Sequence, residues 1–294
     1  MRAVDPRLPG IGLALLSATA FAITPTGAKL AFEDGSNTLT VVTLRAAIGA
    51  ALTAMLMAAT GTRFRLGSRA LRLSLLTGLA SVVASYGFIG SVAFIPVSLA
   101  VVIFFTHPLF VAALWHWQGR ERLTRRKLLL ALAAFAGLAL AVGGVPAVPH
   151  PAGLALAALA AVTLTAVIHY GARAREEATS TQVNLYLNLV SAAVLAAATT
   201  ALGAWALPRG VTGWLGLGVA GLGVTVGLLA FLAAFRFISP VRATMVSNVE
   251  PLLGILFAVA ILGEWLQPVQ WAGIAVVLAA LIAFEWVGKP KPTG

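Results

Sequence analysis

Ten long apolar runs, separated by short connections, limit what this chain can fold into. They cover residues 10–32, 38–59, 73–95, 97–118, 128–146, 152–172, 181–206, 212–236, 240–262 and 269–287. An α-helix needs roughly 20 apolar residues to cross a hydrocarbon core about 30 Å thick. The pattern therefore predicts an all-α integral membrane protein with ten transmembrane helices.

Composition supports this class and excludes others. Hydrophobic residues make up 60% of the 294 residues and charged residues only 10%, against about 25% charged in soluble proteins. A β-barrel would show alternating segments of roughly 10 residues instead of these long runs. The chain has no cysteine, which excludes disulfides, thiolate metal sites and a cysteine nucleophile. Since no P-loop, HExxH, GxSxG or histidine-cluster motif occurs, we expect no enzyme, no cofactor and no bound metal.

The net charge of +11 is explained by where the basic residues lie, so we expect membrane lipid and no nucleic acid as a partner. With the N-terminus inside, 17 of the 20 basic residues fall on the cytoplasmic side. Only Lys29 and Arg209 lie outside, and Arg45 lies within a span. The positive-inside rule then predicts cytoplasmic N- and C-termini. The oligomeric state stays open, and a monomer is compatible with the sequence.

The chain repeats itself at a fixed spacing, the repeat offset (237 − 94 = 143). The segment FIPVSLAVVIFFTHPLF, Phe94–Phe110, recurs in altered form as FISPVRATMVSNVEPLL, Phe237–Leu253. We expect one five-helix repeat over residues 1–147 and a second over residues 148–294. Because five spans is an odd number, the second repeat must be inverted, and the loop charges change sides accordingly. Inverted repeats are typical of transporters whose substrate site lies near the membrane midplane, so we expect a central cavity between the two halves.

One proline interrupts the same span in each repeat. Pro108 and Pro251 each lie about 11 residues into their spans, or ~16 Å, which is near the middle of the membrane. A proline within a helix frees the carbonyl four residues earlier, here that of Phe104 or Ser247. We interpret both prolines as gating positions in kinked helices, with a purely structural kink as the alternative.

Polar residues at membrane depth are the candidate substrate-binding positions. Glu250 is an acidic residue expected near the midplane, where an ionisable group is a functional hypothesis by default. His107 is its counterpart in the first repeat. Hydrogen bonding within the helix bundle is the alternative role for both. The full candidate set is Tyr86, Thr106, His107, Asn188, Ser247 and Glu250.

A polar face on the seventh span has two readings. Asn184, Asn188 and Ser191 follow one another at helical spacing, so they lie on one face of that helix. Amides are costly against lipid, which predicts that this face points inward. It either lines the substrate pathway or holds two helices together, and we favour the second role for Asn184. Separately, the sequence Thr24-Pro25-Thr26 predicts a kink in the first span.

Three segments resemble the EamA-type repeat of the drug/metabolite transporter superfamily. They are VTLRAAIGAAL around Arg45, THPLFVAALWHWQGRERLT, and VEPLLGILFAVAILGEWLQPVQWAGIAVVLAALIAF. The resemblance covers nearly the whole chain. Within the superfamily the chain is similar to bacterial YddG-type amino-acid exporters. The resemblance implies ten helices, with the third, fourth, eighth and ninth around a central cavity, and export of amino acids or related metabolites.

The leading functional hypothesis is a secondary transporter that exports amino acids or similar small neutral metabolites by alternating access. One alternative is an exchanger of anionic metabolites such as sugar phosphates, which would need Lys or Arg inside the cavity. Arg45 is the basic residue we consider for that role, and we expect it to reach toward the outer interface. A multidrug/proton antiporter is a further alternative, because it would use a deep carboxylate such as Glu250. A membrane-embedded enzyme and a structural scaffold fit less well.

Overall fold

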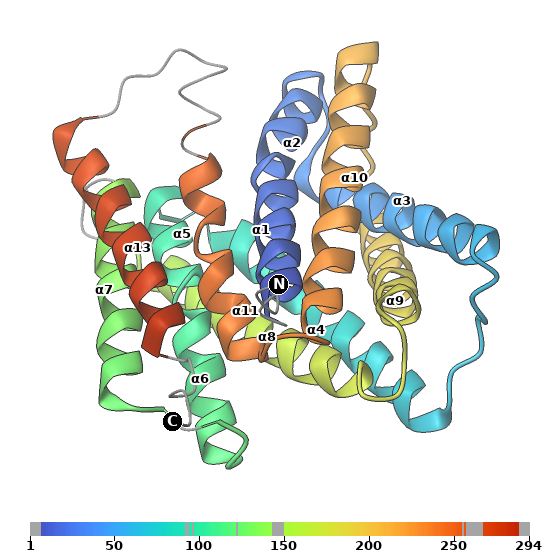
Figure 1. Cartoon of the computed structure of the whole chain (residues 1–294). Coiled ribbons are helices and arrows are strands. Elements are labelled where there is room, and N and C mark those ends of the chain that lie inside the picture. Colours follow the sequence, from blue (N-terminus) through green and yellow to red (C-terminus); the bar gives the residue numbers. More distant parts are fainter. Residues whose placement is uncertain are drawn as a thin grey trace.

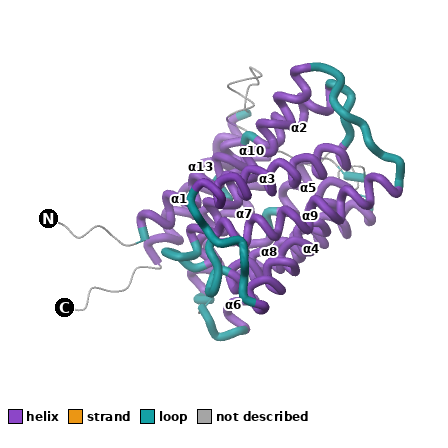
Figure 2. Tube along the Cα trace, turned by 90° about the vertical axis from the view of Figure 1, so that its right-hand side faces the viewer, coloured by secondary structure: helices purple, strands orange, loops and turns teal. Residues whose placement is uncertain are grey.

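The computed structural model describes residues 7–91, 94–95, 97–121, 123–142, 150–254, 256 and 267–287. Within these residues the chain forms helices and loops and no strand (Figures 1 and 2). The helices are α1 Leu8–Ala22, α2 Thr24–Glu33, α3 Thr38–Ala59, α4 Ser68–Ser91, α5 Val97–Phe104, α6 His107–Trp117, α7 Arg125–Val142, α8 Pro151–Ala174, α9 Ser180–Ala201, α10 Val211–Ala234, α11 Pro240–Ser247 and α13 Pro268–Val287. Residues 250–254 are also helical.

The helices have the length and composition of membrane spans. Six are long and apolar enough to cross a bilayer, namely 8–33, 38–59, 68–88, 151–174, 180–201 and 211–234. Residues 102–117 and 268–284 form shorter apolar helices. Each of the ten predicted spans contains at least one helix, so the all-α membrane fold is confirmed.

Several predicted boundaries differ from the observed ones. The third span begins at Ser68 rather than residue 73, and the seventh ends at Ala201 rather than residue 206. In the seventh span, Gly203 adopts φ 57° just beyond the helix, a left-handed conformation that favours glycine and ends helices. The first span is interrupted at Ile23, so α1 and α2 are separate helices and Pro25 lies in the first turn of α2. The predicted ends of the fifth and ninth spans, the junction of the two repeats, and Arg2, Arg122, Lys289 and Lys291 lie outside the described residues.

The repeat offset found in the sequence is preserved in the helix boundaries. Helix α4 begins at Ser68 and α10 at the equivalent position, Val211, and both contain 24 residues. Helix α5 spans 97–104 and α11 spans 240–247, so the same offset separates both of their ends. The two halves therefore carry the same order of helices.

The halves are interleaved rather than laid side by side. Helix α4 of the first half packs on α8 of the second, while its counterpart α10 packs on α1 and α2 (Figure 1). Helices α3 and α9, which are also counterparts, pack on each other, as do α7 and α13. These matching contacts between equivalent helices are the packing expected of a twofold-related repeat.

Two glycines show how closely this relation is kept. A Cβ added at Gly153 would lie 2.6 Å from Ile95 Cγ2 and 2.8 Å from Phe94 Cβ. A Cβ added at Gly10, the equivalent position in the first repeat, would lie 2.9 Å from Ile238 Cγ2 and 2.8 Å from Phe237 Cβ. Real Cβ atoms do not approach other atoms this closely, so both positions admit only glycine without rearrangement.

Polar loop residues tie the halves together at both ends of the bundle. Asn37 Oδ1 accepts the Thr40 N–H at 2.9 Å and caps α3, while its Nδ2 donates to Ala204 O at 2.6 Å. At the opposite end of α9, Thr179 caps that helix, and Gln182 Nε2 donates to Arg63 O at 2.8 Å. Each capping residue thus satisfies a helix end, and each loop joins one half to the other.

Candidate functional site

The two proline-containing spans are broken at equivalent positions. Helix α5 ends at Phe104 and α6 begins at His107, leaving residues 105–106 non-helical. Helix α11 ends at Ser247, and the helix resumes at Glu250. The repeat offset relates Phe104 to Ser247 and His107 to Glu250, so the two breaks begin and end at matching positions.

The sequence predicted a helix broken or kinked by a proline here, and the structure has a short break just before each proline. Pro108 and Pro251 lie in the first turn of a new helix instead of inside a continuous one. A first-turn proline loses no hydrogen bond, because its N–H would have no partner within the helix. The break thus accommodates the proline in a tight backbone turn: Thr106 N–H donates to Ile103 O and Val249 N–H donates to Val246 O, each at 3.1 Å.

Side chains satisfy part of the first break. His107 Nδ1 donates to Phe104 O at 3.1 Å; a carbonyl oxygen can only accept, so Nδ1 carries the proton. This carbonyl is the one the sequence predicted to be freed. Thr106 Oγ1 donates to Ile103 O at 2.6 Å. His107 is buried, and its ring contacts those of Phe104 and Phe105, with both centroids 5.8 Å away.

The second break contains a polar residue that sequence reasoning did not single out. Asn248 is 5% exposed, and its Oδ1 has no hydrogen-bond partner among the described residues. Beside it, Ser247 Oγ donates to Ala243 O at 3.0 Å, and Glu250 begins the next helix. The signal in the sequence was an amide three residues before a proline in an otherwise apolar span. A buried amide oxygen without a partner is costly, which marks this break as a place for a water or ligand group.

The two breaks are joined through one buried cluster. Helix α6 of the first half packs against α11 of the second. Phe105 from the first break shares an apolar cluster with Val241 and Met245 of α11, and Val249 from the second break packs against it. The two breaks therefore border the same buried apolar cluster.

Two predicted site residues lie elsewhere. Asn188 Nδ2 donates to Asn184 O at 2.9 Å and to Asn184 Oδ1 at 3.0 Å. A Cβ added at Gly49 of α3 would lie 2.8 Å from Asn188 Oδ1, so the amide fits into the α3–α9 interface. Tyr86 lies on α4 with 59% of its surface exposed. The structure thus groups Thr106, His107 and Pro108 at one break and Ser247, Glu250 and Pro251 at the other, and it assigns Asn188 contacts between helices.

Asn184 holds helices together, as the sequence suggested. Its Nδ2 donates to Thr53 Oγ1 of α3 at 2.8 Å, and both residues are fully buried. We expect Asn184→Ala to lower the stability of the purified protein by about 1–2 kcal/mol, because an interhelical hydrogen bond in a membrane protein is lost. Thermal unfolding in detergent measures this, with Leu189→Ala on the exposed face of α9 as control. Equal unfolding midpoints for the two variants would contradict this role.

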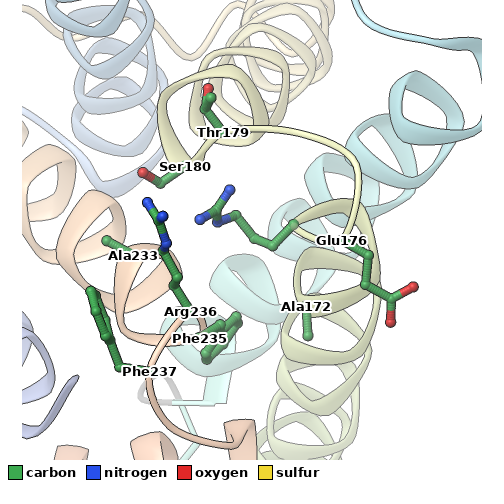
Figure 3. A pocket seen from close by; sticks show the side chains of 9 residues that line it. Ala172, Glu176, Thr179, Ser180, Ala233, Phe235, Arg236 and Phe237 are labelled. Carbon is green, nitrogen blue, oxygen red and sulfur yellow. The ribbon is translucent and has the colours of Figure 1, made fainter. Parts of the chain in front are cut away.

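A pocket of about 540 Å³ opens where α8 and α10 end and α9 begins (Figure 3). None of its lining residues belongs to either break, and it lies at the ends of membrane-length helices. Its lining residues are Ala172, Arg175, Glu176, Thr179, Ser180, Ala233, Phe235, Arg236 and Phe237. Among the residues that the structure describes, no group of three or more His, Asp or Glu side chains forms a metal site.

Comparison with known proteins identifies the family. The profile of the EamA-like transporter family matches residues 8–143 and again residues 151–285. This chain belongs to the EamA-like transporter family. As a member, it is a multi-pass membrane protein whose two matched regions carry the helices described above, and the family name indicates membrane transport.

Individual relatives agree with this assignment. The EamA-like chain is 29% identical over 100 residues to an uncharacterized transporter in the cobO 3' region of Sinorhizobium sp., covering 33% of this chain and 71% of the relative. A crystal structure of a protein with 18% sequence identity aligns with a TM-score of 0.79, over 94% of this chain and 97% of that one. At this identity the structural likeness shows the fold alone.

Proposed function

We propose that this EamA-like transporter is a secondary transporter that exports amino acids or related small neutral metabolites by alternating access, like the YddG-type exporters. The observation that carries the proposal is the pair of helix breaks at equivalent positions in the two repeats. Broken helices at the midplane of inverted repeats are how many transporters build a substrate site. The two halves, residues 1–147 and 148–294, are the proposed moving units.

The groups at the breaks suit a zwitterion. The helices that begin at His107 and at Glu250 direct their N-terminal ends toward the breaks, and a helix N-terminus attracts a carboxylate. The Glu250 carboxylate and the Asn248 Oδ1 acceptor suit an ammonium group. Thr106, His107 and Ser247 are the proposed neutral contacts, and Pro108 and Pro251 are the proposed gates.

Selectivity follows from this composition. A mostly apolar pathway with few polar anchors discriminates weakly among similar side chains. We expect proteoliposomes to carry several neutral amino acids and to carry them faster than a sugar phosphate. The measurement is uptake of radiolabelled compounds, with protein-free liposomes as control. Faster uptake of the sugar phosphate would favour an anion exchanger instead, and transport of lipophilic cations driven by a pH gradient would favour a multidrug/proton antiporter.

Orientation is the second part of the proposal. We place the protein in a bacterial inner membrane with both termini in the cytoplasm, on the distribution of basic residues. A cysteine introduced at Gly35 or Gln267, both exposed, should react with an impermeant thiol reagent added to intact cells. A cysteine at Gly67 or Thr124, also exposed, should react only after the membrane is opened. Labelling of the last two in intact cells would overturn the proposed orientation.

A further inference from the structure

We infer that the pocket between α8, α9 and α10 binds a phosphate group through Arg175 and Arg236. This site is separate from the substrate pathway proposed above. The ligand is either the headgroup of an anionic phospholipid or a free phosphate compound, since both present the same oxygen atoms to the guanidinium groups. Arginine binds phosphate in a bidentate manner that matches its planar fork.

The two arginines stand close together without an acid between them. Burial, together with the charge of Arg236, lowers the pKa of Arg175 below its ordinary value. Arg175 Nε donates to Leu232 O at 3.0 Å, and its Nη1 donates to Ala178 O. These bonds fix the guanidinium between the end of α10 and the start of α9. In the part of the chain that the structure describes, neither Arg175 nor Arg236 forms an ion pair, so the repulsion between them is not compensated by a carboxylate.

The acidic residue in the pocket lining is already engaged. Glu176 Oε1 accepts from Arg120 Nη1 at 3.0 Å, and Glu176 Oε2 lies 3.9 Å from Arg69 Nη2. Figure 3 shows its carboxylate directed away from Ser180 and Arg236. The pocket therefore retains the positive charge of both arginines.

The remaining lining residues complement a phosphate ester. Arg236 extends toward Ser180, the first residue of α9 (Figure 3). The Ser180 hydroxyl and the positive end of this 22-residue helix add to the attraction of the two guanidinium groups. Phe235 and Phe237 also line the pocket and offer apolar surface to the non-phosphate part of a ligand.

Comparison of the two repeats shows that the pair of arginines occurs in the second half only. Subtracting the repeat offset gives Phe32, Ala93 and Asn37 at the positions of Arg175, Arg236 and Ser180. The counterpart of the pocket in the first half thus has neither arginine. Because the halves are inverted, the anion site exists on one membrane face only, the face that carries most of the basic residues. Basic side chains at a membrane surface attract anionic headgroups.

The test measures ligand-induced stabilisation of the purified full-length protein in neutral detergent. One series titrates inorganic phosphate at constant ionic strength. A second compares short-chain phosphatidylglycerol with phosphatidylcholine. Arg236→Gln should raise the half-saturating concentration of the phosphate ligand at least about tenfold, because charge-assisted hydrogen bonds are lost. The control Arg72→Gln removes an exposed arginine. It should leave the half-saturating concentration unchanged within about twofold.

The outcomes separate the two sources. Stabilisation by phosphatidylglycerol alone identifies a lipid headgroup, and stabilisation by inorganic phosphate identifies a free phosphate compound. Arg236→Lys keeps the positive charge but lacks the planar guanidinium fork. We therefore expect its half-saturating ligand concentration to lie between those of the wild type and Arg236→Gln. The proposed site would be contradicted if neither ligand stabilises the protein. It would also be contradicted if Arg236→Gln and Arg72→Gln raise the half-saturating concentration equally.

Discussion

Pro108→Ala and Pro251→Ala are each expected to slow transport by at least about tenfold while leaving the protein folded, since tenfold corresponds to only about 1.4 kcal/mol in the balance between two states. Each proline stands in the first turn after a break. Alanine restores the backbone N–H and removes the ring, which together are worth roughly 3 kcal/mol in a helix interior. The helix could then continue from α5 into α6, or from α11 into the helix that begins at Glu250. A state with a continuous helix would be favoured over one with a break.

The measurement is the initial rate of neutral amino-acid uptake into proteoliposomes. Pro151→Ala is the matched control, because Pro151 starts α8 directly after its extended N-cap residue His150 and not after a break within a span. We expect the control to transport at the parental rate. Parental rates for Pro108→Ala and Pro251→Ala as well would mean that the breaks are structural, and the proposed gating would fail.

Gly153→Leu and Gly10→Leu are expected to destabilise the protein by about 3 kcal/mol each, at the upper end of the range for overpacking. In both places the first added carbon already falls within 3.0 Å of side-chain atoms close to the neighbouring backbone. Neither contact is with the far end of a flexible side chain alone, so the helices must move apart. The repeat predicts that the two substitutions have similar effects.

Thermal unfolding in detergent measures this effect, and the chain supplies close controls. A Cβ at Gly12, on the same helix as Gly10, would meet no atom within 4 Å, and the same holds at Gly218 on α10. Leucine at either control position should change the unfolding midpoint little. If Gly153→Leu and Gly12→Leu unfold at the same temperature, the close contact between α8 and the segment before α5 is not needed for stability.

Much of the fold could be predicted because it depends on composition and repetition. Span-length apolar runs have few alternatives to membrane helices, and the repeat offset already aligned α5 with α11. The helix breaks could not be predicted in the same way. A proline within a span is compatible with a kink or with a break, and the choice depends on neighbours such as the buried Phe105 and the imidazole of His107, which meets the Phe104 carbonyl.

The candidate site was predicted less completely, because burial of a polar group depends on packing. Asn188 and Asn248 are both amides in apolar spans, and the sequence alone gives no reason to rank one above the other. In the structure Asn188 fits against Gly49 and bonds within its own helix, whereas the Asn248 oxygen lacks a partner among the described residues. The packing of α3 against α9 is what shows that Asn188 lies between helices, while the Asn248 oxygen is available to a ligand.

Side-specific labelling of the two breaks tests the central claim most directly. The chain has no cysteine, so labelling of an introduced cysteine has no background from native thiols. Thr106→Cys and Val249→Cys place one cysteine at equivalent positions in the two repeats. In proteoliposomes, impermeant thiol reagents are applied to one side at a time, with and without a neutral amino acid. Alternating access predicts that each cysteine reacts from both sides and that the amino acid shifts the ratio. Reaction from one side only, unchanged by any substrate, would contradict it.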